Sequence, residues 1–226
     1  MSEANSVKAY KGMGMEGFVA RWYAGLTRRS MGEFTALAQR VAREIPPGSQ
    51  VLEVAPGPGY FAIELAKLGS YSVTGLDISH TFVEIAQRNA IEAGVDASFR
   101  QGDAANMPFE NSSFDFLLCR AAFKNFTQPV RALQEMCRVL KQTGTAMIID
   151  LRKDAPKESI NEAVNNMGLG PVNTILTKLT FRFMLLKRAY TRKQFEEFLS
   201  QTRFKSVDIR ESLTGLEVVL QPAQMA

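Results

Sequence analysis

One short stretch, VLEVAPGPGYFA at residues 51–62, constrains the fold of this 226-residue chain more than any other part. Its first four residues form a mainly apolar run, which is typical of a central strand in a parallel sheet. Gly57 and Gly59 follow, and they let the backbone turn sharply and approach a ligand because glycine has no Cβ. A helix over about 60–67 would point its free N–H groups back at this turn. The stretch therefore predicts a strand, a turn and a helix that form a cradle for a nucleotide-like ligand.

A dinucleotide is one candidate ligand for this cradle. Residues 57–62 fit the G-x-G-x-x-A pattern of dinucleotide-binding turns, and Asp77 lies 20 residues after Gly57. Two features oppose a pyrophosphate: the two prolines of the turn have no N–H to donate, and Glu53 would repel the phosphates. The carboxylate of Glu53 would instead favour a cationic ligand. A strand, turn and helix that bind no ligand are the third alternative.

The stretch also resembles motif I of class I S-adenosyl-L-methionine (SAM)-dependent methyltransferases, in which an acidic residue is followed by G-x-G-x-G. Here the motif reads Glu53-x-Ala55-x-Gly57-x-Gly59. SAM carries an ammonium and a sulfonium but no phosphate, so an acidic residue at the strand end suits it. Ala55 replaces the first glycine, and because alanine is the smallest replacement we expect a slightly displaced ligand rather than lost binding.

Two further acidic residues follow predicted strands. Asp77 ends a strand over 71–77, at the end where open α/β sheets bind ligands, and Asp103 follows a strand around Phe99. The resemblance implies that Asp77 accepts hydrogen bonds from the ribose hydroxyls and Asp103 from the adenine amino group. The alternative role for Asp77, a helix cap, is less favoured because Ser79 is already a good cap. The cofactor site implied by the resemblance is Glu53, Ala55, Gly57, Gly59, Asp77, Ile78, Asp103, Ala104 and Cys119.

The segment after the third predicted strand contains further motifs of the same family. MPFENSSFD at 107–115 resembles the LPF-x-x-x-SFD run of small-molecule methyltransferases, and RAAFKNF at 120–126 is similar to a stretch of the C-methyltransferases of ubiquinone and menaquinone biosynthesis. The likeness implies that main chain near Cys119 faces the methionine part of SAM and that Phe123 faces its methyl group. Ordinary core packing is the alternative for Phe123. The Asn-Pro-Pro-aromatic signature of amino-group nucleic-acid methyltransferases is not found here, so we expect no nucleic-acid partner.

Two helical segments flank this central region. Residues 15–45, the lid segment, carry apolar residues at helical spacing, and the resemblance implies that they cover the SAM pocket, with Tyr10 and Tyr23 as candidate contacts. Packing on the sheet is the alternative for Tyr23. Residues 154–190 form the cap segment, in which an apolar stripe at helical spacing is expected to pack inward and Phe183 to line an apolar acceptor cavity. Weak contact with an anionic membrane is the alternative, because residues 163–195 contain six basic residues and no acidic one.

Composition excludes several other classes. The formal net charge of +4 alone implies no nucleic-acid partner, and two cysteines without CxxC spacing predict neither a disulfide framework nor a metal site. No secretory signal and no apolar run of spanning length is evident, so we expect a cytoplasmic protein without an integral membrane segment. His80, the single histidine, lies at a helix start and is expected to be exposed. We assign no catalytic residue.

These observations predict one α/β domain over residues 1–226, a three-layer α/β/α Rossmann-like sandwich. Its seven-stranded, mostly parallel sheet would have an antiparallel strand pair at one edge, formed by 206–210 and 216–220. The predicted activity is methyl transfer from SAM to a small apolar or aromatic molecule, with S-adenosylhomocysteine as product. A nicotinamide-dependent oxidoreductase and a catalytically silent SAM-binding protein are the alternatives. No pattern assigns the acceptor atom or the oligomeric state.

Overall fold

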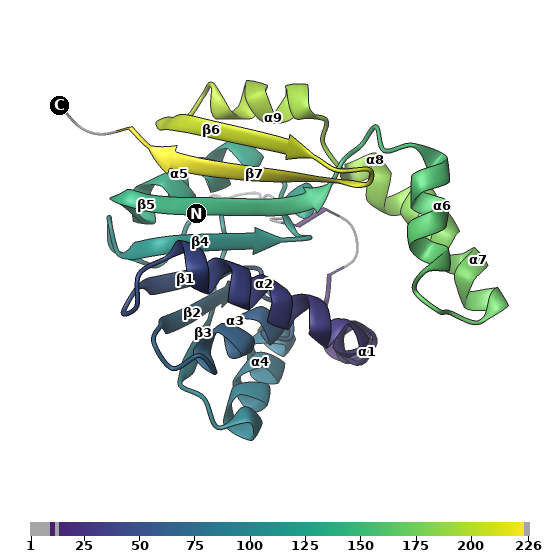
Figure 1. The fold of residues 1–226 in the computed structure, drawn as a ribbon, viewed down its shortest axis with the longest axis horizontal. Helices are drawn as coiled ribbons and strands as arrows, with labels where there is room; N and C mark the ends of the chain where they lie inside the picture. The colour runs from purple at the N-terminus through teal and green to yellow at the C-terminus, as the bar shows by residue number, and fades with distance from the viewer. Residues whose placement is uncertain (1–9, 12–13, 224–226) are drawn as a thin grey trace, which may run out of the picture.

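The computed structural model describes residues 10–11 and 14–223, and its ribbon is drawn in Figure 1. The first 14 residues are polar and contain glycine, which is typical of a mobile terminus. That expectation falls mainly on residues 1–9 and 12–13, which lie outside the described residues.

From residue 50 to residue 151 strands alternate with helices, except that no helix separates the strands over 97–101 and 114–120, and this order is typical of an α/β fold. The strands are β1 (Gln50–Val54), β2 (Ser72–Asp77), β3 (Ala97–Gln101), β4 (Phe114–Arg120), β5 (Leu140–Leu151), β6 (Phe204–Glu211) and β7 (Gly215–Pro222). The helices are α1 (Gly17–Thr27), α2 (Met31–Glu44), α3 (Tyr60–Ala66), α4 (His80–Ala93), α5 (Pro129–Val139), α6 (Lys157–Asn165), α7 (Pro171–Thr180), α8 (Leu186–Arg188) and α9 (Arg192–Leu199).

The seven strands form one sheet in the order β3-β2-β1-β4-β5-β7-β6. β1 pairs in parallel with β2 on one side and with β4 on the other, and Leu52 lies opposite Leu117 in the β1–β4 ladder. The predicted antiparallel pair of strands is formed by β6 and β7 at one edge of the sheet. β7 runs antiparallel to both β5 and the edge strand β6, so the reversed strand lies one place in from the edge.

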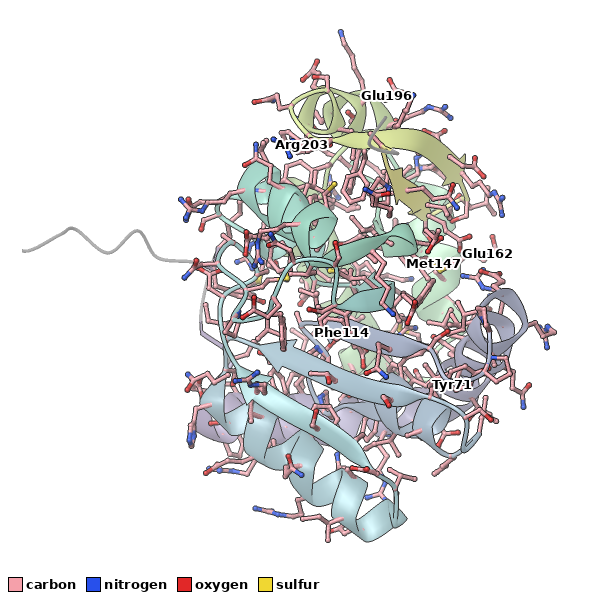
Figure 2. All side chains as sticks on the ribbon, turned by 90° about the vertical axis from the view of Figure 1, so that its left-hand side faces the viewer. Tyr71, Phe114, Met147, Glu162, Glu196 and Arg203 are labelled. Carbon is pink, nitrogen blue, oxygen red and sulfur yellow. The ribbon has the colours of Figure 1, made fainter. Side chains whose placement is uncertain are left out.

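Both faces of the central strands are buried, which explains their continuous apolar sequence. Successive residues of β1 point to opposite faces: Val51 packs in the cluster that contains α2, α3 and α4, and Leu52 packs in the cluster that contains α5 and α9. The two clusters are the two hydrophobic cores of a three-layer α/β/α arrangement, which is the predicted architecture. Figure 2 looks on the amino ends of the strands, marked by Tyr71 and Phe114 just before or at the start of β2 and β4.

The lid segment contains two helices. α1 ends at Thr27, and a 3₁₀ turn over Arg28–Ser30 redirects the chain into α2. α2 buries Leu37, Ala38 and Val41 against the sheet, while α1 lies beyond the carboxyl ends of the parallel strands (Figure 1). The turn therefore separates a helix that covers a face of the sheet from one that borders its ligand-binding edge.

The cap segment corrects the expectation of an inward-facing stripe. Ile160 and Val164 of α6 are buried, together with Ala155, and only Phe181 and Leu186 of the following helices pack on this small cluster. α7 has no buried residue. Among the helices of the cap segment, only α6 buries side chains in this cluster. The apolar stripe of α7 and of the turn after it therefore faces solvent. Its exposed members are Val172, Ile175, Leu176, Leu179, Phe183 and Met184.

None of the helices within residues 10–11 and 14–223 combines the length and the apolar content of a membrane span.

Candidate functional site

The order of the strands reverses between β1 and β4, and this is where open α/β sheets form a ligand-binding crevice. The chain leaves β1 toward α3 on one face and leaves β4 toward α5 on the other, so the two loops diverge. Each loop begins with a non-glycine residue in the left-handed region: Ala55 has φ of 56° and Ala121 has φ of 58°. Two strained turns therefore border the switch point of the sheet, and each has alanine, the smallest residue with a Cβ, in the left-handed position.

Glu53 lies inside the end of β1 and is 3% exposed. One carboxylate oxygen, Oε2, accepts a hydrogen bond of 3.1 Å from the N–H of Ala62 in the first turn of α3. Burial raises the pKa of Glu53 to about 8, although the Ala62 N–H and the Arg120 guanidinium oppose the rise, and the charge of Asp77 adds to it. Ionising a carboxyl group in such a buried position costs free energy, and a bound cation would favour its charged form.

Asp77 ends β2 and is 5% exposed. Its two oxygens accept N–H groups from the turn after β1 and from the next loop: Oδ2 from Gly57 at 3.0 Å and Oδ1 from Ser79 at 2.9 Å. Burial raises the pKa of Asp77 to about 6 against these two hydrogen bonds, so Asp77 ionises before Glu53. The Gly57 N–H, which a dinucleotide fold would direct at pyrophosphate, is thus already bonded to a carboxylate.

The glycine turn is required by packing as well as by backbone conformation. Gly57 and Gly59 have φ of 55° and 76°. A Cβ at Gly59 would lie 2.8 Å from the ring of Phe99 and 2.9 Å from the Cβ of Ala86, so no side chain fits there. Asn89 of α4 donates to the Pro58 carbonyl at 2.9 Å and holds the turn against that helix.

The loops after β2 and β3 are tied together at the same edge of the sheet. The N–H of Gly102 donates to the Asp77 carbonyl at 2.9 Å, and the Gln101 side chain donates to the Ile78 carbonyl at 3.2 Å. Asp103 is half-buried, and its Oδ1 accepts the Ala105 N–H at 2.9 Å. Asp77 and Asp103 thus follow neighbouring strands of the sheet, as the sequence predicts, while their contacts with ribose and adenine stay predictions.

Of the remaining predicted cofactor residues, Ile78 is 38% exposed, Ala104 is half-buried and Cys119 is fully buried. Burial raises the pKa of the Cys119 thiol well above its usual value, so this side chain is a core group and only its main chain can face a ligand. Next to it, Arg120 donates to Glu33 at 2.7 Å and lies over the ring of Phe34, at 4.5 Å from its centroid.

The start of α1 is fastened beside Asp77 by contacts that the sequence analysis missed. The Glu16 carboxylate accepts the N–H groups of His80 and Thr81, both at 3.0 Å, and the Thr81 hydroxyl at 2.6 Å. The Ser79 hydroxyl donates to the Met15 carbonyl at 2.6 Å while it caps α4. An acidic residue 64 positions before a helix start gives no local sequence signal for such a cap. His80 itself is exposed, as predicted.

The predicted acceptor residues differ in their surroundings. Tyr23 is half-buried and packs edge-on against Phe82, at 5.9 Å between ring centroids. Phe123 is fully buried and stacks on Phe195 at 4.9 Å, which favours the core-packing alternative. Phe183 is 51% exposed on the outward stripe of the cap segment, so it does not line an enclosed cavity here.

A second polar group lies at the ends of β4 and β5. The Lys124 ammonium and the Asp150 carboxylate form a buried pair with Nζ–Oδ1 of 2.8 Å. Lys124 Nζ also donates to the Ala121 carbonyl, and Asp150 Oδ2 accepts the Lys124 N–H at 2.8 Å. This pair holds the strained turn at Ala121 in place. A lysine and an aspartate 26 residues apart did not stand out in the sequence.

Tyr10 and Lys11 connect the N-terminal part of the chain to this region. Tyr10 forms an isolated antiparallel bridge with Phe126, and Lys11 Nζ donates to the Tyr190 hydroxyl. Burial raises the pKa of Tyr10, with Arg188 opposing the rise and with Tyr23, Asp77 and Asp150 adding to it. The carboxylates of Asp77 in β2 and Asp150 in β5 therefore both contribute to the electrostatic environment of Tyr10. Within the described residues, no group of three or more metal-ligating side chains is present.

Comparison with known proteins agrees with this geometry. The model of the family described as "Methyltransferase domain" matches residues 52–148. The demethylmenaquinone methyltransferase of Staphylococcus epidermidis is 30% identical over 174 residues, which cover 76% of this chain and 67% of that protein. The uncharacterized methyltransferase YcgJ of Bacillus subtilis is 34% identical over 53% of this chain and 47% of its own length. The chain spans about half the length of most of the curated relatives it matches first.

Solved structures show the same fold. A protein of Methanococcus maripaludis described as a candidate SAM-dependent methyltransferase superposes with a TM-score of 0.78 at 18% identity, over 97% of this chain and 99% of that one. The structure of YcgJ superposes with a TM-score of 0.59 at 25% identity, over 81% of this chain and 71% of that one. The chain belongs to the class I SAM-dependent methyltransferase family. The resemblance stated from the sequence is confirmed. The comparisons give no support to the dinucleotide alternative.

The buried Glu53 gives a prediction in which stability and binding change in opposite directions. Folding raises the pKa of Glu53 from 4.5 to about 8, so the protonated carboxyl group adds to the free energy of unfolding below pH 4.5. This contribution is lost as the pH rises through 8. Glu53→Gln avoids this loss, so at pH 8.5 we expect the variant to be about 2 kcal/mol more stable, or about 5 °C higher in Tm, but more than tenfold weaker in SAM binding. Thermal unfolding at pH 5 and 8.5, together with calorimetry, measures both.

The matched control for this prediction is Glu92→Gln on the exposed end of α4, which should change neither quantity. A Glu53→Gln variant that is less stable than the native protein at pH 8.5, or that binds SAM equally well, would contradict the account of this site.

The strained turn at Ala55 gives a second prediction. Because its φ of 56° is strained for alanine, Ala55→Gly should stabilise the protein by about 1 kcal/mol even though glycine loses more chain entropy on folding. Chemical denaturation measures the change. Ala36→Gly on the exposed face of α2 is the control and should destabilise by about 0.5–1 kcal/mol. The same sign for both substitutions would show that the turn stores no strain.

Proposed function

We propose that this protein transfers the methyl group of SAM to a small, apolar or aromatic molecule. The observation that carries the proposal is the pair of buried carboxyl groups, Glu53 and Asp77, whose charges interact at the switch point of the sheet. Such a pair suits a cationic nucleoside without phosphates, because each carboxylate is costly to keep ionised until a positive group arrives.

The residues present fit SAM as a co-substrate. SAM supplies an activated methyl group on a sulfonium. Glu53 would neutralise its cationic methionine part and Asp77 would accept the ribose hydroxyls, with Asp103 and Ala104 at the adenine and Ile78 against the ring. Gly57 and Gly59 let the backbone approach closely, as their φ values support. The protein's contribution is positioning and exclusion of water, since the methyl group is already activated.

The acceptor side supports an apolar molecule whose reactive form is an anion. Burial, and then the positive charge of Arg188, lower the pKa of Lys11, so two cations act in the same part of the structure. Lys11 also donates to the hydroxyl of Tyr190. Two cations beside an aromatic wall would hold a phenolate or a similar oxygen anion, and so promote attack on the methyl group. The names of the relatives, demethylmenaquinone methyltransferase and ubiquinone/menaquinone biosynthesis C-methyltransferase, support a quinone-type aromatic acceptor.

We propose that residues 15–45 serve as a lid and 154–190 as a cap on the one domain formed by residues 1–226. The contacts of Glu16 and Ser79 support a lid that is fastened next to the ribose position. Tyr23, half-buried near Phe82, stays a candidate acceptor contact, as does Phe183 if the cap moves inward. Cys119 and Cys137 are both free thiols, which supports a reducing, cytoplasmic setting.

Binding of SAM tests the proposal directly. We expect calorimetry to show SAM binding by the native protein and at least tenfold weaker binding by Asp77→Asn, because a hydrogen bond to a charged acceptor contributes about 1.5–3 kcal/mol. Asp96→Asn, on an exposed loop before β3, is the control and should bind normally. Equal binding by Asp77→Asn would reject the assigned role of Asp77. Full SAM binding without methylated product across a panel of phenolic and quinol acceptors would identify a catalytically silent protein instead.

The acceptor assignment gives its own prediction. Lys11→Met keeps the length of the side chain but removes its charge, so kcat/KM for a phenolic acceptor should fall about tenfold or more while the Kd for SAM stays unchanged. Lys157→Met, on the exposed start of α6, is the matched control and should leave both constants unchanged. A change in SAM affinity with unaltered acceptor kinetics would place Lys11 on the cofactor side.

A further inference from the structure

The helices that follow α6 expose an apolar stripe that has no partner within the described residues. Ile175 is 60% exposed, Leu176 is 56% exposed and Phe183 is 51% exposed, although side chains of this kind are usually buried. They recur at helical spacing through α7 and the π-helical turn Phe181–Leu185, so they form one continuous face rather than scattered contacts. A contiguous apolar face of this sort marks an interaction surface.

α1 exposes a second stripe. Phe18, Trp22 and Leu26 follow each other at intervals of four residues, and they are 77%, 59% and 39% exposed. The opposite face of α1 is the one that packs on the protein, through buried Ala20 and Ala24. Figure 1 shows α1 and α7 on the same side of the molecule, beyond the carboxyl ends of β4 and β5. Both stripes therefore border the edge of the sheet that holds the candidate site.

Within the helices that carry the two stripes, every charged residue is basic. Residues 17–32 contain three arginines and no acidic residue, and residues 163–191 contain four basic residues and no acidic one. Arg182 and Lys187 lie over the ring of Phe183, at 5.4 and 5.8 Å from its centroid, so apolar and basic groups share one surface. Arg21, Lys178 and Arg182 form no ion pair with any described residue.

We propose that these two stripes and their basic residues form a docking surface for an anionic lipid bilayer. The docking surface consists of Phe18, Trp22 and Leu26 of α1 with Ile175, Leu176 and Phe183 of the cap segment. Its apolar side chains would enter the headgroup region, while Arg21, Lys178 and Arg182 contact lipid phosphates.

The charge pattern selects a bilayer over a second copy of the chain. Two copies meeting through this surface would bring the same basic residues together, and residues 17–32 and 163–191 contain no acidic residue to offset the repulsion between like charges. An anionic bilayer provides both the apolar layer and the compensating charge. Docking on a bilayer does not require methyl transfer, so its test needs neither SAM nor an acceptor.

Trp22 is the single tryptophan of the chain and lies in the docking surface, so its fluorescence reports docking directly. We expect the full-length protein to co-sediment with vesicles of phosphatidylcholine and phosphatidylglycerol in a 7:3 ratio, with a blue shift of the Trp22 emission. Vesicles of phosphatidylcholine alone should bind at least tenfold more weakly, and binding to the anionic vesicles should fall steeply between about 0.1 and 0.5 M salt.

Two pairs of variants separate the apolar and the basic contributions. Ile175→Ser with Phe183→Ser, and separately Lys178→Gln with Arg182→Gln, should each weaken vesicle binding about tenfold or more. The controls are Ile91→Ser, which is 72% exposed on α4, and Arg43→Gln with Arg88→Gln, which removes the same charge from exposed positions of α2 and α4. The controls should bind like the native protein, and all substituted side chains are exposed or half-exposed, so circular dichroism should show every variant folded.

Three results would overturn the proposal. One is the absence of binding and of a blue shift with anionic vesicles. The second is equal binding by all the variants. The third is a dimer in sedimentation equilibrium that Ile175→Ser with Phe183→Ser converts to a monomer, because the occupant of the surface would then be a second copy.

Discussion

The site depends on one unfavourable interaction, the burial of the Glu53 carboxyl group at the end of the central strand β1. Its position is fixed by the parallel ladders to β2 and β4 on its two sides, so the group cannot turn out to solvent without breaking the sheet. A single hydrogen bond from the Ala62 N–H offsets only part of the cost of desolvation, and the pKa of about 8 measures what is left. The charged form of Glu53 is thus favourable only when a cation is bound. The two hydrophobic cores on the faces of the sheet fix the strand that carries this residue.

The two strained turns follow from the same geometry. Ala55 comes directly after β1 and Ala121 directly after β4, and each must bend the chain away from the switch point within one residue. The turn at Ala55 is secured by the glycine turn and by the bond from the Gly57 N–H to Asp77. The turn at Ala121 is secured by Lys124, which donates to the Ala121 carbonyl and forms a buried ion pair with Asp150. Left-handed alanines persist where surrounding contacts over-determine the backbone, and the switch point of the sheet lies between two such places.

The sequence predicted what depends on local patterns and missed what depends on distant pairs. The strand that carries Glu53, the glycine turn and Asp77 could be placed, because apolar runs and glycine spacing act within a few residues. The cap on α4 from Glu16 and the Lys124–Asp150 pair could not, since each joins residues far apart in the chain. The prediction that the stripe of α7 packs inward was wrong, because helical periodicity shows that an apolar face exists but not what covers it. Phe123 was ambiguous for a related reason, since a core phenylalanine and one that faces a ligand have the same sequence pattern.

The N-terminal part of the chain couples the two halves of the site. Glu16 and Met15 contact the loop that follows Asp77, while Lys11 contacts Asn125 and Tyr190 on the acceptor side. Fewer than ten residues therefore separate a contact beside the proposed ribose position from one beside the proposed acceptor position. Because these contacts are hydrogen bonds that are partly open to solvent, we expect them to open more easily than either hydrophobic core. An acceptor that arrives from an apolar phase would meet α1 and the cap segment first, so the stretch that we propose as a lid over the cofactor would also border the entry path.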